Sequence, residues 1–400
     1  GAYTSGMMAV SPPNSATRAR ISGNPSVPLP LISSPSTSKA ALANAGGSLS
    51  AARFKTAGPR ASAASGSQTL AGVTLGNRMY QTVADLPEWR GSVVAYVIEA
   101  VSTGTSTSTS TSTDVTYTTR VAWDAAKANG FVPCDPNDPV PCNPPSETRW
   151  RQRKVFFSDT TGAVHEILDG SGNIRSSSKS TLLSMGMGAN ADETERIIQW
   201  MLGKIDDPND PNPRPINPAV MGSVINSMPI SVGPPGLSPL PGGGHFYYTH
   251  ASRPELVYVG ADDGMLHAFN ASDGSEVFAF IPADMVPVIA RLYAQGGQRY
   301  NPSEHIYGLS GSPKVKNLCV ARCAVTGPSC SDEENGVYNE STCPDWRTIL
   351  IMGEGQGGNH PFALDITNPI VGGKATLTSS SLLWHAGYKN ANGISVGELG

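Results

Sequence analysis

The stretch that most constrains the fold is residues 256–282, LVYVGADDGMLHAFNASDGSEVFAFIP, which reads as three short β-strands joined by two tight turns. Asp262-Asp263-Gly264 predicts the first turn, in which Gly264 can take a positive φ angle, and Ser272-Asp273-Gly274 predicts the second. The residues between these turns alternate with a period of two, as in a strand. Because a meander of this size is too small to be stable alone, the pattern predicts a repeated unit.

A second copy of the pattern occurs at residues 347–369, RTILIMGEGQGGNHPFALDITNP. Phe362-Ala363-Leu364-Asp365 matches His267-Ala268-Phe269-Asn270, and each copy is preceded by a strand with Ser and Pro, at residues 227–232 and 312–315. Two such copies predict a mainly β fold, a modified β-propeller with short helices and long loops.

The composition supports turn-rich β-structure. The chain has 43 Gly and 33 Pro, and 15% of its residues are charged, which favours β-structure over helical bundles. A net charge of −4 gives no reason to expect nucleic acid or an anionic membrane as a partner. No apolar run is long enough for a membrane span.

The pattern divides the chain into an arm and a propeller domain. Residues 1–79, rich in Ser, Ala, Gly and Pro, predict an extended arm or linker. Residues 80–400 predict the propeller, with insertions at 102–114, 134–142 and 319–343. The chain begins with Gly and stops within a strand pattern, so we expect a piece of a longer protein and a propeller truncated at its C-terminal end.

Three segments indicate other local structures. Residues 192–202 predict the clearest helix, with Asp192 as its cap. A short helix interrupted at Pro287 is expected at 283–294, and a hairpin is expected from 150–157 and 163–168 across the turn at 159–162. We also expect Asp262 and Asp263 to bond their own backbone in the turn.

The six cysteines indicate disulfides and therefore an exported protein. Cys134 and Cys142 bracket the loop CDPNDPVPC and are the expected first pair. Cys319, Cys323, Cys330 and Cys343 lie in one insertion, where three pairings are open. Zinc is the weaker alternative, because the paired Cys-x2-Cys knuckles of most zinc sites are missing.

Metal and cofactor motifs are weak. Asp135 and Asp138 in one Pro-rich loop, and Asp206, Asp207 and Asp210 in another, are weak candidates for calcium, which needs several converging oxygens. In the sequence HFYYTH, His245 and His250 would face opposite sides of a strand, and His267 is expected to be a satisfied histidine of the sheet.

Catalytic and nucleotide-binding motifs are not convincing either. The sequence Gly353-x-Gly355-x-x-Gly358 formally matches a dinucleotide fingerprint, but a strand pattern follows it where a helix is needed, so we expect a turn. We find no nucleophile with its base, and expect no catalytic residue and no bound cofactor.

Several motifs resemble, in order, the propeller domain of the PilC/PilY family of type IV pilus tip and assembly proteins. They cover about residues 80–400, and 258–269 is the most specific. They are residues 89–96 (WRGSVVAY), 123–125 (WDA), 221–229 (MGSVINSMP), 232–235 (VGPP), 258–269 (YVGADDGMLHAF), 311–313 (GSP), 357–358 (GG) and 362–367 (FALDIT).

The resemblance implies a protein at the pilus tip or cell surface, exported through the periplasm. It would support pilus assembly, counteract retraction, and adhere to host or abiotic surfaces through propeller loops. Its partners would be the minor and major pilins. The family's usual calcium site lies beyond this chain, and its von Willebrand A-like domain is not visible here.

Two alternatives remain open. The segment 259–269 also resembles the repeats of pyrroloquinoline-quinone dehydrogenases, whose quinoprotein propeller has the same architecture, although the adjacent cysteines beside the quinone in those enzymes are absent here. A periplasmic propeller scaffold for outer-membrane assembly is the other alternative.

Overall fold

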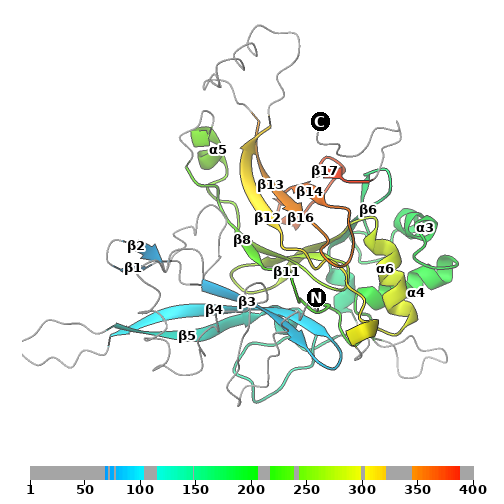
Figure 1. The fold of residues 1–400 in the computed structure, drawn as a ribbon, viewed down its shortest axis with the longest axis horizontal. Coiled ribbons are helices and arrows are strands. Elements are labelled where there is room, and N and C mark those ends of the chain that lie inside the picture. The colour runs from blue at the N-terminus through cyan, green and yellow to red at the C-terminus, as the bar shows by residue number, and fades with distance from the viewer. Residues whose placement is uncertain are drawn as a thin grey trace, which may run out of the picture.

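The fold is mostly β, with strands in several sheets and few helices (Figure 1). The computed structural model describes residues 68–70, 73–75, 78–102, 115–146, 148–205, 217–237, 243–298, 302–320 and 345–387. Strands β1 (Gln68–Leu70) and β2 (Val73–Leu75) pair within the region predicted as an arm. The predicted insertion at 102–114, apart from Ser102, and most of the predicted insertion at 319–343 lie outside the described residues.

The predicted meander forms the centre of a six-stranded sheet. Its strands are β9 (Leu256–Gly260), β10 (Leu266–Asn270) and β11 (Glu276–Ile281), all antiparallel, and β8 (Ile230–Val232) precedes them as expected. Gly264 and Gly274 have φ angles of 85° and 76°, so both turns need glycine.

A hairpin from earlier in the chain extends this sheet. Strands β6 (Val155–Ser158) and β7 (Val164–Glu166) form the predicted hairpin. β6 pairs in parallel with β11, which gives the order β7-β6-β11-β10-β9-β8. Since β6 and β11 lie more than a hundred residues apart, local sequence pattern gave no sign of this pairing.

The second copy of the pattern forms its own antiparallel sheet. The strands β12 (Lys314–Cys319), β13 (Trp346–Met352), β14 (Phe362–Asp365) and β17 (Leu382–His385) lie in that order. A small hairpin of β15 (Ile370–Val371) and β16 (Lys374–Ala375) stands between β14 and β17 in the chain. The repeat of a preceding strand and a meander is therefore present in both copies.

A third sheet consists of β3 (Arg78–Asp85), β4 (Arg90–Ser102) and β5 (Val115–Asp124). Gly91 of β4 lies so close to the neighbouring chain that a Cβ atom there would meet the carbonyl oxygen of Gly222 at 1.8 Å. No sheet among the described residues closes on itself as a barrel.

Helices α3, α4 and α6 cluster on the right of Figure 1, whereas α5 lies at the upper left. The helix α4 packs against both α3 and α6. The helical elements are α2 (Ala125–Ala128), η1 (Arg149–Gln152), α3 (Ser176–Ser184), α4 (Ala191–Met201), α5 (Gly243–Thr249), α6 (Met285–Ala294) and η2 (Pro302–Glu304). None of the described helices is long and apolar enough to cross a bilayer.

Three local predictions were wrong. Helix α4 is capped by Asn190, whose side chain accepts a hydrogen bond from the amide of Glu193, and Asp192 lies in the first turn instead. Residues 283–294 contain one uninterrupted helix, because Pro287 lies in the first turn of α6, where its missing N–H costs no helical bond. His245 lies in helix α5 and not in a strand.

The hydrophobic core lies between the two repeated sheets and the helices. Its largest fully buried side chains include Tyr258, Phe278, Phe280 and Phe362, and the rings of Phe280 and Phe362 meet across the two sheets at 5.6 Å. A smaller cluster around Trp123 and Phe269 joins the third sheet to the six-stranded sheet. Burial of this apolar surface holds the three sheets together.

Candidate functional site

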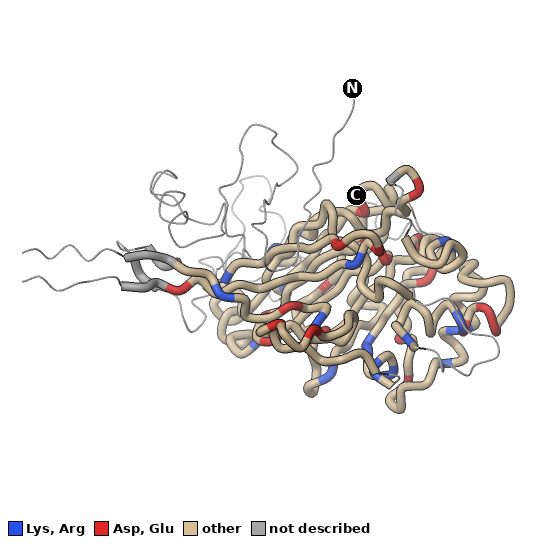
Figure 2. Tube along the Cα trace, turned by 90° about the horizontal axis from the view of Figure 1, so that it is seen from below, with Lys and Arg blue, Asp and Glu red and all other residues tan. Residues whose placement is uncertain are grey.

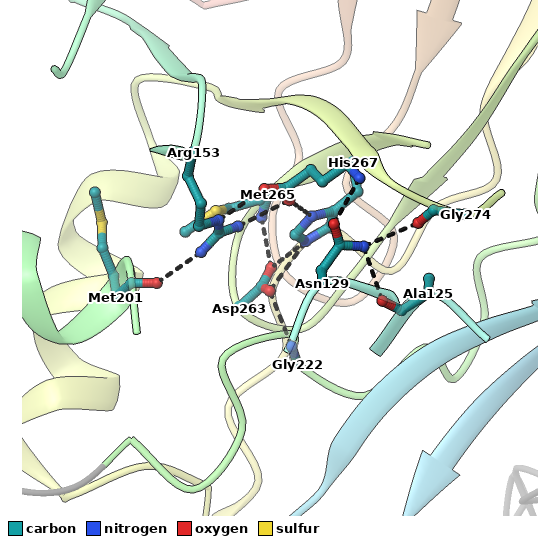
Figure 3. A network of polar contacts seen from close by, with 10 residues as sticks. Ala125, Asn129, Arg153, Met201, Gly222, Asp263, Met265, His267 and Gly274 are labelled. Atoms are coloured by element: carbon teal, nitrogen blue, oxygen red, sulfur yellow. Dashed lines mark hydrogen bonds and ion pairs between the residues drawn. The ribbon is translucent and has the colours of Figure 1, made fainter. Parts of the chain in front are cut away.

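Two groups of buried polar side chains stand out among the described residues. The first lies in the six-stranded sheet around His267, whose side chain is fully buried (Figure 3). Its Nδ1 atom lies 2.9 Å from Oε1 of Glu276, and its Nε2 atom lies 3.0 Å from Oδ2 of Asp263. His267 is thus a satisfied histidine of the sheet, as the sequence predicted.

Arg153 completes this group. Its guanidinium donates two hydrogen bonds to Glu276, at 2.7 and 2.8 Å, and a third to the carbonyl oxygen of Met201 at the end of α4 (Figure 3). The side chains of Arg153 and Glu276 are both buried. This buried ion pair joins α4 to the six-stranded sheet. Arg153, Glu276 and His267 each have a charged partner within the group.

The ionisation of these groups follows from their partners. Burial alone would raise the pKa of Glu276, but Arg153 and His267 lower the pKa of Glu276 to about 2. Burial would lower the pKa of His267, yet Asp263 and Glu276 raise the pKa of His267 to about 9. At neutral pH the imidazole is therefore charged and both nitrogens donate, which leaves it no free base for catalysis.

Asp262 and Asp263, the two adjacent aspartates of the first turn, have different hydrogen-bond partners. Asp263 bonds its own backbone as predicted, since it accepts a hydrogen bond from the amide of Met265. For Asp262 the prediction was wrong. It accepts hydrogen bonds from the Ser223 hydroxyl and the Gly308 amide, and lies 3.2 Å from Nε2 of His305. A long-range contact has replaced the local one, because the turn is buried under the neighbouring segments.

The second group lies where the two repeated sheets meet and consists of Asp284, Glu354, His360 and His385. Asp284 directly precedes α6, Glu354 and His360 lie in the turn from β13 to β14, and His385 ends β17. Ligand atoms of Asp284, Glu354 and His360 all lie within 4.8 Å of one another. In the described part of the chain this is the one group of three or more such side chains that converges in this way.

The two carboxyl groups of the second group have pKa values that are shifted in opposite directions. Burial is the main reason that the pKa of Glu354 rises to about 7, and the charge of Asp284 beside it adds to the effect. Burial opposes ionisation of Asp284 as well, but His385 holds the pKa of Asp284 below its ordinary value. Burial would lower the pKa of His385, and the two carboxylates raise it.

Of the residues predicted for calcium, only Asp135 and Asp138 lie in the described part of the chain. Asp135 accepts a hydrogen bond from the amide of Asn137, and Asp138 pairs with Lys127 and accepts from the amide of Val140. Asp206, Asp207 and Asp210 lie outside the described residues. Calcium at either loop stays a prediction.

The predicted loop disulfide is present. Cys134 and Cys142 are bonded, with their Cα atoms 5.8 Å apart. Cys319 is also disulfide-bonded, whereas Cys323, Cys330 and Cys343 lie outside the described residues. The pairing within that insertion stays a prediction.

The glycine-rich segment 353–358 is a turn between two strands, as expected, and not the start of a helix. What the sequence did not reveal is that this turn carries Glu354 and His360 toward Asp284. The four residues of the second group are spread over about a hundred positions, and no spacing within the chain connects them.

The fold is that of a mostly β protein with repeated sheets, and the buried charges around His267 are all paired with one another. No family model matches the chain. It is similar to the type IV pilus biogenesis factor PilY1 homolog of Xylella fastidiosa, with 29% identity over 236 residues, which cover 55% of this chain and 15% of that protein. It is also similar to the type IV pilus biogenesis factor PilY1 of Pseudomonas aeruginosa strain PAK, with 32% identity, 48% of this chain and 14% of that protein.

The chain is thus PilY1-like, which confirms the resemblance found in its motifs. It spans about one seventh of the length of these two curated relatives. Among solved structures, the C-terminal domain of Pseudomonas aeruginosa PilY1 matches at 25% identity, with a TM-score of 0.23, and covers 39% of this chain and 25% of that one.

Proposed function

We propose that this chain is part of a type IV pilus biogenesis factor. The observation that carries the proposal is the similarity to PilY1 proteins of two genera, at 29–33% identity over 38–55% of the chain. The relatives are named as biogenesis factors, and the same role is proposed for the protein to which this chain belongs.

The domain would act as a rigid scaffold and not as an enzyme. Residues 80–400 would form a modified, quinoprotein-like propeller, with residues 1–79 as an arm. The two successive sheets of the same pattern support a propeller, since blades are repeated four-stranded sheets. The complete pairing of His267, Glu276 and Arg153 supports a structural use of the most buried charges in the six-stranded sheet.

Contacts with partners would come from loops. The insertions at 102–114, 134–142 and 319–343 would present variable surface on a rigid base, and the Cys134–Cys142 bond would limit the entropy that its loop loses on binding. Figure 2 shows Lys and Arg interspersed with Asp and Glu along the described chain, which favours a protein partner over a polyanion. Minor and major pilins at the tip, and a host or abiotic surface, are the proposed partners.

The test is a deletion of the encoding gene in its own bacterium, complemented with the full-length gene or with a version that lacks the segment of residues 78–387. We expect surface pilin to fall strongly in the deletion strain while total pilin stays constant, and to recover with the full-length gene alone. Unchanged surface pilin in the deletion strain would contradict the role in biogenesis. Recovery with the shortened gene would contradict the role of this domain.

A further inference from the structure

The second group, in which Glu354 and His385 are buried and Asp284 and His360 are partly buried, has the properties of a metal site. The group has two carboxylates and two imidazoles, of which Asp284 stands at the start of α6 and the other three belong to the four-stranded sheet and its β13–β14 turn. Oδ1 of Asp284 and Oε1 of Glu354 are both buried and accept no hydrogen bond of good geometry, although each faces Nε2 of His385, at 3.3 and 3.6 Å. Since a buried acceptor without a donor destabilises a fold, these oxygens need an explanation.

Glu354 provides the strongest evidence for a metal site. Its side chain is 0% exposed, and its Oε2 atom accepts a hydrogen bond from the amide of His360 at 2.9 Å. That bond fixes the carboxylate and leaves Oε1 facing the cluster. A Cβ atom at Gly358 would lie 2.0 Å from Oε2 of Glu354 and 3.4 Å from Oδ2 of Asp284, so a glycine is needed beside the two carboxylates.

The side chain of Asp284 does not cap its helix. It is the N-cap residue of α6, where an aspartate commonly accepts a hydrogen bond from the first turn of the helix. Here its side chain makes no capping bond. Its Oδ2 atom lies 3.3 Å from Nδ1 of His360, and its Oδ1 atom lies 3.3 Å from Nε2 of His385. The carboxylate turns toward both histidines instead of the helix.

The spacing of the atoms fits metal ligands better than direct pairs. Bonds of about 2.0–2.2 Å to a tetrahedral ion place neighbouring ligand atoms about 3.3–3.6 Å apart. The two contacts of Asp284 measure 3.3 Å, and Nε2 of His385 lies 3.6 Å from Oε1 of Glu354. By comparison, His165 lies 2.8 Å from Asp159 and His267 lies 2.9 Å from Glu276.

We propose that Asp284, Glu354 and His360, with His385 in reach of a fourth position, bind one divalent transition-metal ion. Mixed nitrogen and oxygen ligands suit an ion such as Zn²⁺, whereas Ca²⁺ prefers oxygen alone. His360 is 36% exposed, which gives the ion a path from solvent. A bound ion would link the start of α6 to the four-stranded sheet.

The experiment uses the full-length secreted protein, stripped with chelator and kept without reductant so that its disulfides remain. Zn²⁺ is added alone, and bound metal is measured by calorimetry and by elemental analysis after dialysis. The variants are His360→Gln and Glu354→Gln. His165→Gln is the matched control, because His165 also pairs with a carboxylate but has no third ligand beside it among the described residues.

We expect one Zn²⁺ to be lost in each of the two variants, or to bind at least about 100-fold more weakly, since even indirect support of a ligand is worth 10–100-fold. The His165→Gln protein should bind as the wild type does. Excess Zn²⁺ should raise the melting temperature of the wild type by about 5 °C, and that of the His360→Gln protein less.

Two results would overturn the proposal. One is that Zn²⁺ binding is absent, or is equal in the wild type and the His360→Gln protein. The other is that Ca²⁺ binds with the same dependence on His360 while Zn²⁺ does not. Melting curves without metal show whether each variant is folded, so a folding defect is separated from the loss of a ligand.

Discussion

Glu276 is the residue on which the buried charges of the six-stranded sheet converge. It accepts hydrogen bonds from Arg153 and contacts His267, and all three side chains are at most 5% exposed. Removing one partner of such a group leaves the others as buried charges without compensation, which typically costs about 3–5 kcal/mol. The group therefore ties stability to pH.

The free energy of unfolding should depend on pH through His267. Its pKa is about 9 in the folded protein against an ordinary 6.5, so its contribution is complete below pH 6.5 and is lost as the pH rises through 9. About 3 kcal/mol should be lost over this range. Urea denaturation from pH 6 to 9.5 should show the decline in the wild type and a flatter profile in the His267→Gln protein.

Equal slopes in the two proteins would contradict this prediction. The acid side has the opposite sign, because the pKa of Glu276 is lowered from 4.5 to about 2. Its contribution is present above pH 4.5 and is lost as the pH falls toward 2.

At the scale of elements, the turn between β13 and β14 is held by close approach of the backbone. A Cβ atom at Gly357 would lie 1.8 Å from the carbonyl oxygen of Gly308, whereas one at Gly353 would meet nothing within 4 Å. The two glycines are four residues apart in the same turn, which makes them a matched pair.

We expect Gly357→Ala to lower the free energy of unfolding by about 1–3 kcal/mol, because the backbone must shift to admit the methyl group. Gly353→Ala should change it by less than about 0.5 kcal/mol. Chemical denaturation of both proteins at one pH measures the difference. Equal effects at the two positions would show that the close approach at Gly357 does not matter.

The strands of both repeated sheets could be predicted because their information is local. Alternating apolar residues and turn glycines such as Gly264 predicted all the strands of the six-stranded sheet and β12, β13 and β14 of the second sheet, although β17 lies beyond the β15–β16 hairpin that the pattern did not reveal. Helix α5 was missed because the aromatic run around Phe246 has no clear period. The cap of α4 was missed because Asn190 and Asp192 are both good cap residues.

At the scale of the whole molecule, pairing between distant segments decides the arrangement. The parallel pair β6–β11 joins residues 155–157 to residues 279–281, and the second polar group joins Asp284 to His385. Neither leaves a local signal, since a strand or a carboxylate has the same pattern whatever its distant partner is. For the first polar group, the sequence predicted only that His267 would be a satisfied histidine of the sheet. It did not identify Asp263 and Glu276 as the partners of His267.

The most direct measurement of the proposed role is quantitative mass spectrometry of pili sheared from the encoding bacterium. A strain that lacks the major pilin serves as the control. If the protein belongs to the pilus system, its peptides, including those of residues 80–400, should be present with pilin in the wild-type fraction and depleted from the control. Equal amounts in both fractions, or peptides confined to the cell pellet, would contradict association with the pilus.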